Sequence, residues 1–582
     1  MTLLSLALLC TALARQDDAN RQSKKEPPPR TLYRINFELD FDARTYTGRE
    51  RVRWVNRDDR PASVVYFHLY PNLRADDERP GTQDAQADAA TPEEPRLEVT
   101  AVRAAEGWQA LPFSAEDDGV TLRVLLREAV APGTAAEMEL AFKGTLPEID
   151  PDETSLTAHV IQQVGAAMRD TREIRRARDT NFVSRGVMLL GDFYPVLAAR
   201  EGGDWQRKVE PSVGDTFFTD VADYEVEVET AEGVNLYASC EQRQEAPAGR
   251  RRRLTFAGAD LRGFALVAGR TLRMEEREAG GLRVRSVYTP EHEKVGRRVL
   301  GVAADAARTY AARFGPLPLK NVTVTEAPLV AGFGSVEFAG LAVIAGAFYV
   351  DFDSPAMRAL PELVREQRAS VEDNLEFAAA QGVARQWWGG AVGSDPAREP
   401  VLHEALAQFS ALLYVQDVRG AESAQQVQDD QLRGVYQVYR TFGGEDVTAD
   451  RAAREYRNSF QYAAVVAGKG ALMFVELRRL LGEERFFKAL RGYYEANRLE
   501  VAETEDLRAA FAAVAELPQR RALTRTFSRW LSERHGDEDI APPNPQLLAA
   551  LGFTPEQQQA ARDRNAFSRL GRFFWRQMTR IR

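Results

Sequence analysis

The chain has 582 residues, which exceeds one ordinary hydrophobic core and predicts two or three domains. Hydrophobic residues make up 44% of it and charged residues 28%, a balance typical of soluble globular proteins. The formal net charge of −10 argues against a nucleic-acid partner, because an acidic surface repels the phosphate backbone.

The N-terminal residues have the pattern of a secretory signal peptide. An apolar run extends from Leu3 to Leu13, and the sequence ALA at positions 12–14 fits a small-residue cleavage site. We therefore assign residues 1–14 to a signal peptide. This assignment predicts an exported protein, located in a periplasm, outside the cell or at the cell surface.

An antiparallel, sandwich-like β domain is predicted over residues 30–275, after a polar, proline-ended and disordered lead-in at 15–29. Apolar residues alternate along its first strand, at Tyr33, Ile35, Phe37, Leu39 and Phe41. Two segments interrupt the strand pattern, an acidic loop at 75–95 and an Arg-rich insertion at 155–185. We expect the charges of the insertion to face solvent.

A mostly helical domain with a small sheet is predicted over residues 284–535. Apolar residues take up helical spacing at its start, at Val295, Val299, Val302, Ala306, Tyr310 and Phe314. The chain is thus expected to be an α+β protein of several domains. A linker rich in proline and acidic residues is predicted at 536–548.

The tail at 549–582 contains a predicted basic amphipathic helix. Apolar residues share one face of this helix, at Phe567, Leu570, Phe574, Met578 and Ile581. Such a helix contacts an anionic membrane surface or a partner, or it docks on its own domain, and the pattern leaves both open. No run of about 20 apolar residues follows the signal peptide, so we expect no transmembrane helix.

The segment QGVARQWWGG at 381–390 has the outline of a zinc-peptidase helix without its chemistry. Such a helix carries two histidine ligands at i and i+4 and a glutamate general base after the first histidine. Gln381 and Arg385 stand at the two histidine positions, and Gly382 stands at the position of the base. Glu404 follows Arg385 after 18 intervening residues.

These residues make the chain resemble the gluzincin aminopeptidases, the family of aminopeptidase N and leukotriene hydrolase, over roughly residues 30–535. The family pattern is H-E-x-x-H followed by Q-W-W-G and, at the spacing found here, a glutamate ligand. Gln386, Trp387, Trp388 and Gly389 match the second part, and Glu404 falls at the ligand position. The resemblance implies a thermolysin-like fold for the helical domain.

Two further motifs agree in part with this family. Its G-x-M-E-N motif, which binds the free amino group of the substrate, resembles GSVEF, where Gly334 and Glu337 are kept. Val336 and Phe338 depart from that motif. The family's Y-x-K-G motif supplies an oxyanion-stabilising tyrosine, and it resembles AGKG here. Lys469 and Gly470 match, Ala467 replaces the tyrosine, and Tyr462 lies five residues earlier.

The replaced positions argue against a metal. A guanidinium stays protonated and offers no lone pair, so Arg385 is no ligand, and Gln381 is a weak neutral oxygen donor. A replacement histidine has to come from His68, His159, His292, His403 or His535. His403 adjoins Glu404, but neighbouring helical residues point about 100° apart. We therefore expect no zinc cofactor and a bidentate Arg385–Glu404 salt bridge in its place.

The leading hypothesis is a catalytically inactive, exported aminopeptidase-fold protein, a pseudopeptidase that binds a peptide or protein. No functional catalytic residue is expected, since Gly382 and Ala467 occupy the catalytic positions, while Gly334 and Glu337 are a vestigial site for a peptide N-terminus. The alternative is an active zinc metallo-aminopeptidase with an atypical metal site. A different hydrolase in the same cleft finds no support, because the sequence lacks a G-x-S-x-G elbow.

Overall fold

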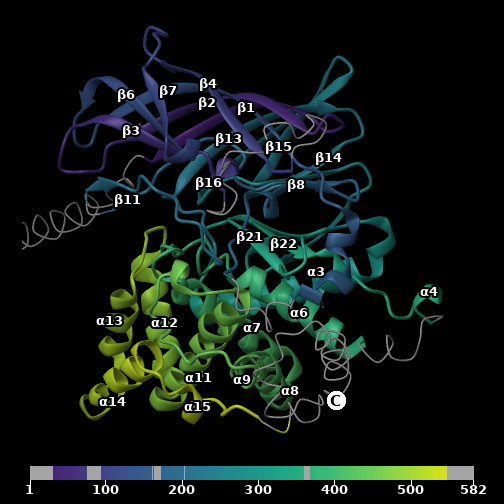
Figure 1. Ribbon diagram of the computed structural model, residues 1–582, viewed down its shortest axis with the longest axis vertical. Coiled ribbons are helices and arrows are strands. Elements are labelled where there is room, and N and C mark those ends of the chain that lie inside the picture. Colours follow the sequence, from purple (N-terminus) through teal and green to yellow (C-terminus); the bar gives the residue numbers. More distant parts are fainter. Residues whose placement is uncertain are drawn as a thin grey trace, which may run out of the picture.

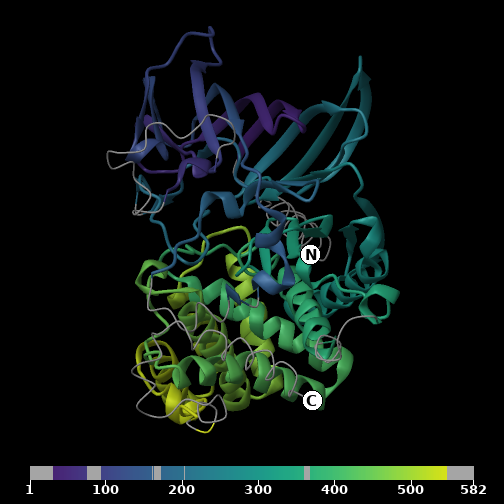
Figure 2. The same ribbon diagram turned by 45° about the vertical axis from the view of Figure 1, so that its right-hand side comes forward.

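The computed structural model describes residues 30–74, 93–159, 161–162, 172–201, 203–358, 368–544 and 546. The predicted signal peptide, the lead-in, nearly all of the acidic loop, the centre of the Arg-rich insertion and the basic C-terminal helix lie outside these residues. Figures 1 and 2 show a β-rich domain, formed by roughly the first 270 residues, packed on one side of a mainly helical domain.

A seven-stranded sheet organises the β-rich domain. Its strands follow the spatial order β15 (Glu241–Ala248), β16 (Arg251–Leu261), β13 (Ala222–Ala231), β1 (Thr31–Asp40), β2 (Thr45–Val55), β7 (Ala135–Thr145) and β4 (Arg96–Ala104). Its pairs are antiparallel except β1 and β13, which run parallel with Tyr33 opposite Tyr224. The rings of these two tyrosines stack at 4.9 Å. The sandwich-like domain is confirmed, but the sheet is mixed.

Two four-stranded sheets complete this domain. One has the order β10 (Val196–Leu197), β3 (Ala62–His68), β6 (Thr121–Val130) and β5 (Phe113–Glu116). The other has the order β14 (Asn235–Ala238), β17 (Leu266–Gly269), β9 (Val187–Leu190) and β8 (Asn181–Ser184). Because β8 is fully buried, the end of the predicted Arg-rich insertion is in fact core structure.

A five-stranded sheet opens the second domain. Its order is β18 (Arg273–Ala279), β19 (Leu282–Tyr288), β20 (Asn321–Ala327), β22 (Leu341–Ala345) and β21 (Ser335–Phe338). Strand β18 pairs with β19 and with no strand of the first domain in the described chain. The domain boundary therefore lies just before Arg273, earlier than the boundaries at 275 and 284 predicted from periodicity.

Helices pack on this sheet and on one another to form the helical body of Figure 1. Helices α3 and α6 contact the sheet, α7 packs on α6, and α11 packs on α7. The main helices are α3 (Glu293–Phe314), α6 (Arg368–Ala384), α7 (Pro400–Arg419), α8 (Ala421–Val427), α9 (Gly434–Thr441), α11 (Gly470–Leu481), α12 (Glu483–Asn497), α13 (Thr504–Val514) and α14 (Leu517–Phe527). Short segments add α4 (Pro355–Arg358), α10 (Ser459–Tyr462) and α15 (Gly536–Asp539).

The helical run Ser459–Leu481 is long and apolar enough to cross a membrane by length and composition alone. Within its apolar window, 67% is buried inside the protein, as in the core helix of a folded domain. The start of the predicted linker is also structured, since α15 covers Gly536–Asp539 and Arg440 forms an ion pair with Asp537.

Arg262 joins the two domains beside the cleft described below. Its guanidinium donates to the carbonyl oxygens of Thr219 (3.1 Å), Gly390 (3.1 Å) and Glu500 (2.7 Å). A Cβ at Gly393 would lie 2.4 Å from the Cζ of Arg262, so glycine is required for this close approach. The junction therefore fixes the β-rich domain against the end of α6.

Glu50 is a carboxyl group buried in the core of the β-rich domain. It is 0% exposed, and neither of its oxygens has a hydrogen-bond partner among the described residues. Burial raises the pKa of Glu50 well above its usual value, so the folded protein keeps this proton to a higher pH than the unfolded chain. The free energy of unfolding therefore falls as pH rises above about 4.3.

We expect Glu50→Gln to remove this pH-dependent loss. The difference in melting temperature between the variant and the unsubstituted protein should therefore be larger, in favour of the variant, at pH 8 than at pH 5. Thermal denaturation at both pH values measures the difference, and Glu98→Gln, on an exposed side chain, is the control. Equal pH dependence in Glu50→Gln and in the unsubstituted protein would show that Glu50 is not a buried, protonated acid.

Candidate functional site

A cleft lined by residues of both domains lies between them. The β-rich domain contributes the charged residues Arg175, Asp192 and Asp215 to its lining. The second domain contributes Glu337 from β21 and Arg385 from the turn that follows α6, with His403 from α7. Glu337 and Arg385, which the sequence motifs indicated, therefore line the same cleft as charged residues of the β-rich domain that no motif indicated.

Arg385 occupies the centre of these charges. Its backbone N–H donates to the carbonyl of Gln381 at 2.9 Å, so the two side chains share a helix face as predicted. The Arg385 side chain is 7% exposed, and its Nη2 donates a hydrogen bond to Asp215. Its Nε lies 3.7 Å from Oε2 of Glu337, and its Nη2 lies 3.9 Å from Oε1 of Glu404.

The predicted Arg385–Glu404 ion pair is present, but it is not bidentate and Glu404 is not the nearest partner. Glu404 lies at the outer limit of an ion pair with Arg385, and no hydrogen bond joins the two described side chains. Asp215 takes the hydrogen bond instead. The guanidinium thus connects the end of α6 to the β-rich domain by a hydrogen bond and to α7 by a longer ion pair.

Asp215 lies in the loop between β12 (Asp204–Trp205) and β13, where no sequence motif marks it. It also accepts a hydrogen bond from Arg175 Nη1. Burial alone would raise the pKa of Asp215, but Arg175 and Arg385 hold it below the usual value. The carboxylate is therefore charged and lies between two guanidinium groups.

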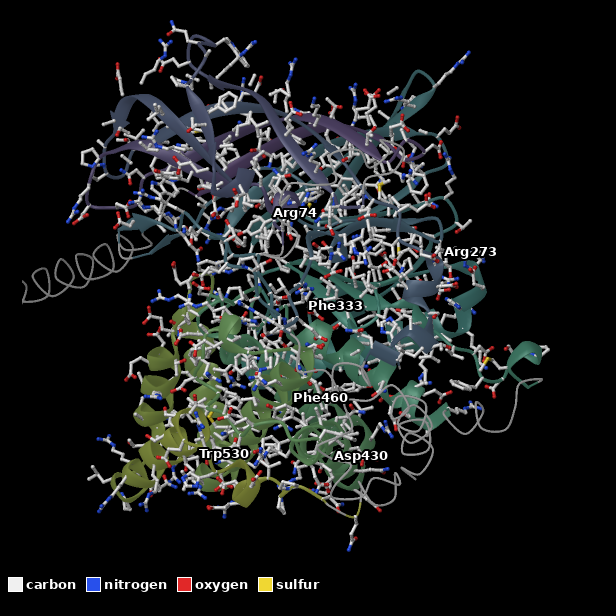
Figure 3. All side chains as sticks on the ribbon, viewed as in Figure 1. Arg74, Arg273, Phe333, Asp430, Phe460 and Trp530 are labelled. Carbon is white, nitrogen blue, oxygen red and sulfur yellow. The ribbon has the colours of Figure 1, made fainter. Side chains whose placement is uncertain are left out.

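Arg175 corrects the expectation that the charges of the Arg-rich insertion face solvent. Its side chain is largely buried, and its guanidinium lies 4.9 Å from the ring centroid of Phe333. Figure 3 labels Phe333 between the β-rich and the helical domains. Arg175 therefore belongs to the cleft and helps to neutralise its carboxylates.

His403 and Glu404 both reach the cleft cluster, contrary to the argument from helical angles. His403 is 3% exposed, and its Nε2 lies 3.9 Å from Oε1 of Glu404. The ligand atoms of Asp215, His403 and Glu404 all lie within 4.8 Å of one another. Burial raises the pKa of Glu404 to about 7, although Arg385 opposes this shift. A spacing rule alone could not find Asp215 or His403.

Glu337 is placed by the edge strand β21, opposite Ala342 of β22. Its Oε1 is buried and has no hydrogen-bond partner in the described part of the chain. Burial raises the pKa of Glu337, while Arg385 lowers it. Gly334 precedes this strand, and its carbonyl accepts a hydrogen bond from the Ala345 N–H at 2.9 Å. Of the two motif residues kept in GSVEF, Glu337 therefore lines the cleft, and Gly334 fixes the start of its strand.

The position of the general base is closed by packing. A Cβ at Gly382 would lie 2.9 Å from the Cβ of Ala342, closer than real side chains approach. A glutamate at 382 would therefore require β22 to shift. Gln381, at the first histidine position, accepts a hydrogen bond from Ser335 Oγ at 3.2 Å and ties α6 to β21.

The surviving QWWG residues have structural partners. Gln386 Oε1 accepts from the Gly340 N–H at 2.6 Å, and Trp387 Nε1 donates to the Gly315 carbonyl at 3.0 Å. Trp388 Nε1 donates to Ser410 Oγ at 3.0 Å. Gly389 has φ +106°, a conformation that favours glycine. These contacts explain the motif without any need for catalysis.

The segment that resembles the family's oxyanion motif has no tyrosine at position 467. Ala467 lies within the π-helical segment Ala463–Lys469, and Tyr462 is the residue just before this segment. The Tyr462 hydroxyl is buried and packs against Gly214. A Cβ added at Gly214 would lie only 2.9 Å from the hydroxyl oxygen. Burial raises the pKa of Tyr462, and the charges of Glu404 and Asp215 raise it further. Tyr462 therefore borders the cluster.

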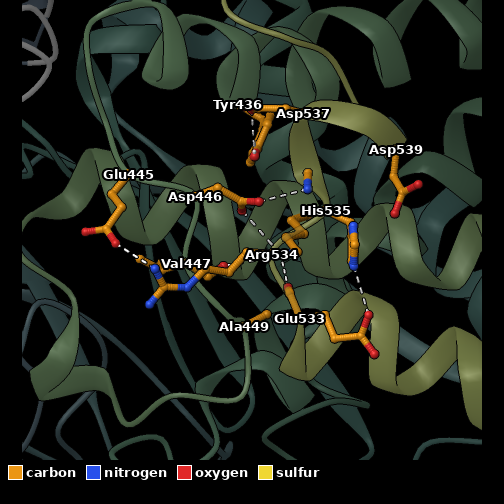
Figure 4. Close-up of polar contacts among 12 residues, drawn as sticks. Tyr436, Glu445, Asp446, Val447, Ala449, Glu533, Arg534, His535, Asp537 and Asp539 are labelled. Carbon is orange, nitrogen blue, oxygen red and sulfur yellow. Dashed lines mark hydrogen bonds and ion pairs between the residues drawn. The ribbon is translucent and has the colours of Figure 1, made fainter.

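Lys469 has a structural role in place of a catalytic one. Its buried ammonium group lies 3.4 Å from Asp446 Oδ1 and donates to the carbonyls of Val447 (3.2 Å) and Glu533 (3.0 Å). Figure 4 shows Asp446 bound to the backbone at the start of α15 and Glu445 paired with Arg534. Lys469 thus anchors the C-terminal end of the described domain.

The other four histidines are not available to the cluster. Each contacts a group elsewhere: His68 with Thr121, His159 with the Leu329 carbonyl, His292 with Glu326, and His535 with Glu533 and Glu538. The family's own ligand positions, 381 and 385, do not fit zinc, because Arg385 has no lone pair to donate. Asp215, His403 and Glu404 offer suitable atoms, but the Arg385 guanidinium lies among them.

Arg385→Met should leave Asp215, Glu337 and Glu404 without their shared cation. Breaking a buried ion pair costs about 3–5 kcal/mol, so we expect a loss of this order in the free energy of unfolding. Chemical denaturation measures it, with Arg297→Met as the control, since Arg297 forms ion pairs on the surface. An unchanged stability of Arg385→Met would contradict the assigned role.

Residues 363–530 match the Peptidase family M1 domain. No protein with a curated description matches the sequence of the chain.

Among solved structures, a point mutant of the M1 zinc metallopeptidase from Deinococcus radiodurans is 16% identical, with a TM-score of 0.57. The similarity covers 87% of this chain and 95% of that one. The same enzyme bound to a Tyr-Ser-Ala substrate is 15% identical, with a TM-score of 0.53 and coverage of 87% and 95%. A two-domain M1 zinc metallopeptidase bound to L-tryptophan is 17% identical, with a TM-score of 0.56 and coverage of 87% and 94%. The chain therefore has the fold of the M1 zinc metallopeptidases, with a Peptidase family M1 domain in residues 363–530.

Proposed function

We propose that this protein is a non-catalytic protein of M1 peptidase fold that binds peptides in its interdomain cleft. The observation that carries the proposal is the Arg385 guanidinium, buried at a metal-ligand position and hydrogen-bonded to Asp215. It supplies a fixed positive charge to the carboxylates around it, as a metal would. It supplies no Lewis acid and no site for an activated water.

The surroundings of Arg385 support the loss of hydrolysis. Zinc peptidases need a base to accept the proton of the metal-bound water, and Gly382 has no side chain for this role. Ala342 fills the space that a side chain at 382 would enter. Ala467 likewise offers no hydroxyl for an oxyanion. The chain thus lacks the two histidine ligands, the base and the motif tyrosine together.

Glu337 supports retained peptide binding. Its buried Oε1 has no partner among the described residues, and Glu337 lines the interdomain cleft. An α-ammonium group would satisfy this oxygen with a charge-assisted hydrogen bond. Structural neighbours bound to a tripeptide and to a free amino acid are in keeping with a ligand of this class.

We also propose that the protein is exported and that it contacts a membrane surface or a protein partner. The predicted signal peptide at 1–14 supports location in a periplasm, outside the cell or at its surface. The basic helix predicted at 549–582 would contact an anionic membrane surface or a protein partner. The acidic net charge of −10 continues to disfavour nucleic acid.

One observation favours the alternative, an active metallo-aminopeptidase with an atypical site. Asp215, His403 and Glu404 bring three possible ligand atoms together, and the Tyr462 hydroxyl borders them. The two functions differ in metal content and turnover, so one measurement separates them.

We expect purified full-length protein to hold much less than one zinc per chain and to release no chromophore from aminoacyl substrates. Elemental analysis and a chromogenic aminopeptidase assay, each with and without a chelator, test this. Stoichiometric zinc together with chelator-sensitive turnover would establish the alternative.

We expect a free tripeptide such as Tyr-Ser-Ala to bind and its N-acetylated form to bind at least about tenfold more weakly, because acetylation removes the charge-assisted hydrogen bond to Glu337. Glu337→Gln should weaken binding of the free peptide to a similar extent and leave the acetylated peptide unaffected. Isothermal titration calorimetry measures both. Equal affinity for the two peptides would contradict capture of the N-terminus.

A further inference from the structure

His403 is oriented like a metal ligand that lacks its metal. Its Nδ1 is held by Ser394 Oγ at 2.8 Å, and its Nε2 is buried without a hydrogen-bond partner among the described residues. Metal-binding histidines typically use one nitrogen for the metal and the other for an orienting hydrogen bond. An Nδ1–H donated to Ser394 would leave the Nε2 lone pair directed at the cluster. A buried, unpaired nitrogen is costly unless something satisfies it.

The groups around Nε2 complete a ligand set. Possible ligand atoms of Asp215 and Glu404 lie within 4.8 Å of each other and of the histidine nitrogen. One imidazole nitrogen and two carboxylate oxygens suit a borderline divalent metal, such as zinc or cobalt, with water in the remaining position. The three residues come from two domains: Asp215 from the β-rich domain and the other two from α7.

Arg385 competes for the same oxygens. Its Nη2 donates to Asp215 and lies 3.9 Å from Glu404 Oε1, so the guanidinium occupies the carboxylates that a metal would need. A second cation placed beside it would also be repelled at short range. The site is thus closed by a cation that belongs to the chain itself.

We propose that Asp215, His403 and Glu404 form a site for a divalent transition metal, with a ligand set that differs from the family pattern in two of its three members, and that Arg385 keeps this site closed. This proposal concerns metal binding alone and holds whether or not the cleft binds peptides. It differs from the proposed function because it concerns a metal site that opens when the guanidinium is removed, and from the active metallo-aminopeptidase alternative because it requires no turnover.

The test is a titration of full-length protein with Co²⁺, followed by the visible absorption of the bound ion. Arg385→Gln keeps a group that can donate to Asp215, and Arg385→Met removes the donor. We expect each variant to bind Co²⁺ at least about 100-fold more tightly than the unsubstituted protein, because a buried positive charge is lost. Zinc should also raise the melting temperature of the variants more than that of the unsubstituted protein.

His403→Ala in the Arg385→Gln background should abolish the gain. The matched control is His292→Ala in the same background, which removes a histidine that contacts Glu326 outside the cluster and should leave the gain intact. Folding of every variant is checked by circular dichroism.

The proposal is overturned if folded Arg385 variants bind Co²⁺ no more tightly than the unsubstituted protein, or if the gain survives His403→Ala. Arg385→Gln keeps a hydrogen-bond donor at the position that contacts Asp215, so this variant decides the outcome if Arg385→Met does not fold.

Discussion

The cleft depends on one buried positive charge. Asp215, Glu337 and Glu404 approach one another closely, and without a cation their mutual repulsion and their loss of hydration would favour separation of the two domains. Arg385 provides that cation from the end of α6, and Arg175 provides a second one from the β-rich domain. An ion pair thus joins the two domains across the cleft. Because a guanidinium has no open coordination position, it stabilises these carboxylates without supplying the chemistry of a metal, which is the basis of the proposed non-catalytic function.

The remains of the peptidase motifs follow from packing. Gln386, Trp387 and Trp388 each bind a separate part of the second domain, so the packing of the fold is sufficient to account for them. Positions 381, 382 and 467 do not carry the residues of the family pattern. At 382 the change is reinforced by Ala342, whose Cβ leaves no space for a side chain. Lys469, which resembles a motif residue in the sequence, serves the packing of the C-terminal segment instead. A motif that survives around a changed centre therefore reports on the fold and does not by itself report on catalysis.

Periodicity and motif spacing predicted the β-rich domain, the helical domain and the shared helix face of Gln381 and Arg385. They could not predict the parallel pairing of β1 with β13, because the pairing joins segments nearly 200 residues apart. The site was predicted in part: Glu337, Arg385 and Glu404 were placed in one cleft by resemblance. Asp215 and Arg175 were missed because each lies in an irregular segment whose place depends on the packing of the two domains. His403 was excluded as a neighbour of Glu404 because the angle between adjacent helical residues describes the directions of their Cβ atoms. The ends of two long side chains can still approach each other, as those of His403 and Glu404 do.

The most direct measurement of the central claim is X-ray diffraction from crystals of the unsubstituted protein equilibrated with micromolar zinc, recorded on both sides of the zinc absorption edge. The account predicts no anomalous peak in the cleft and continuous density for the Arg385 guanidinium against Asp215. A zinc peak between Asp215, His403 and Glu404, with Arg385 turned away, would contradict the claim that this arginine stands in the place of the metal.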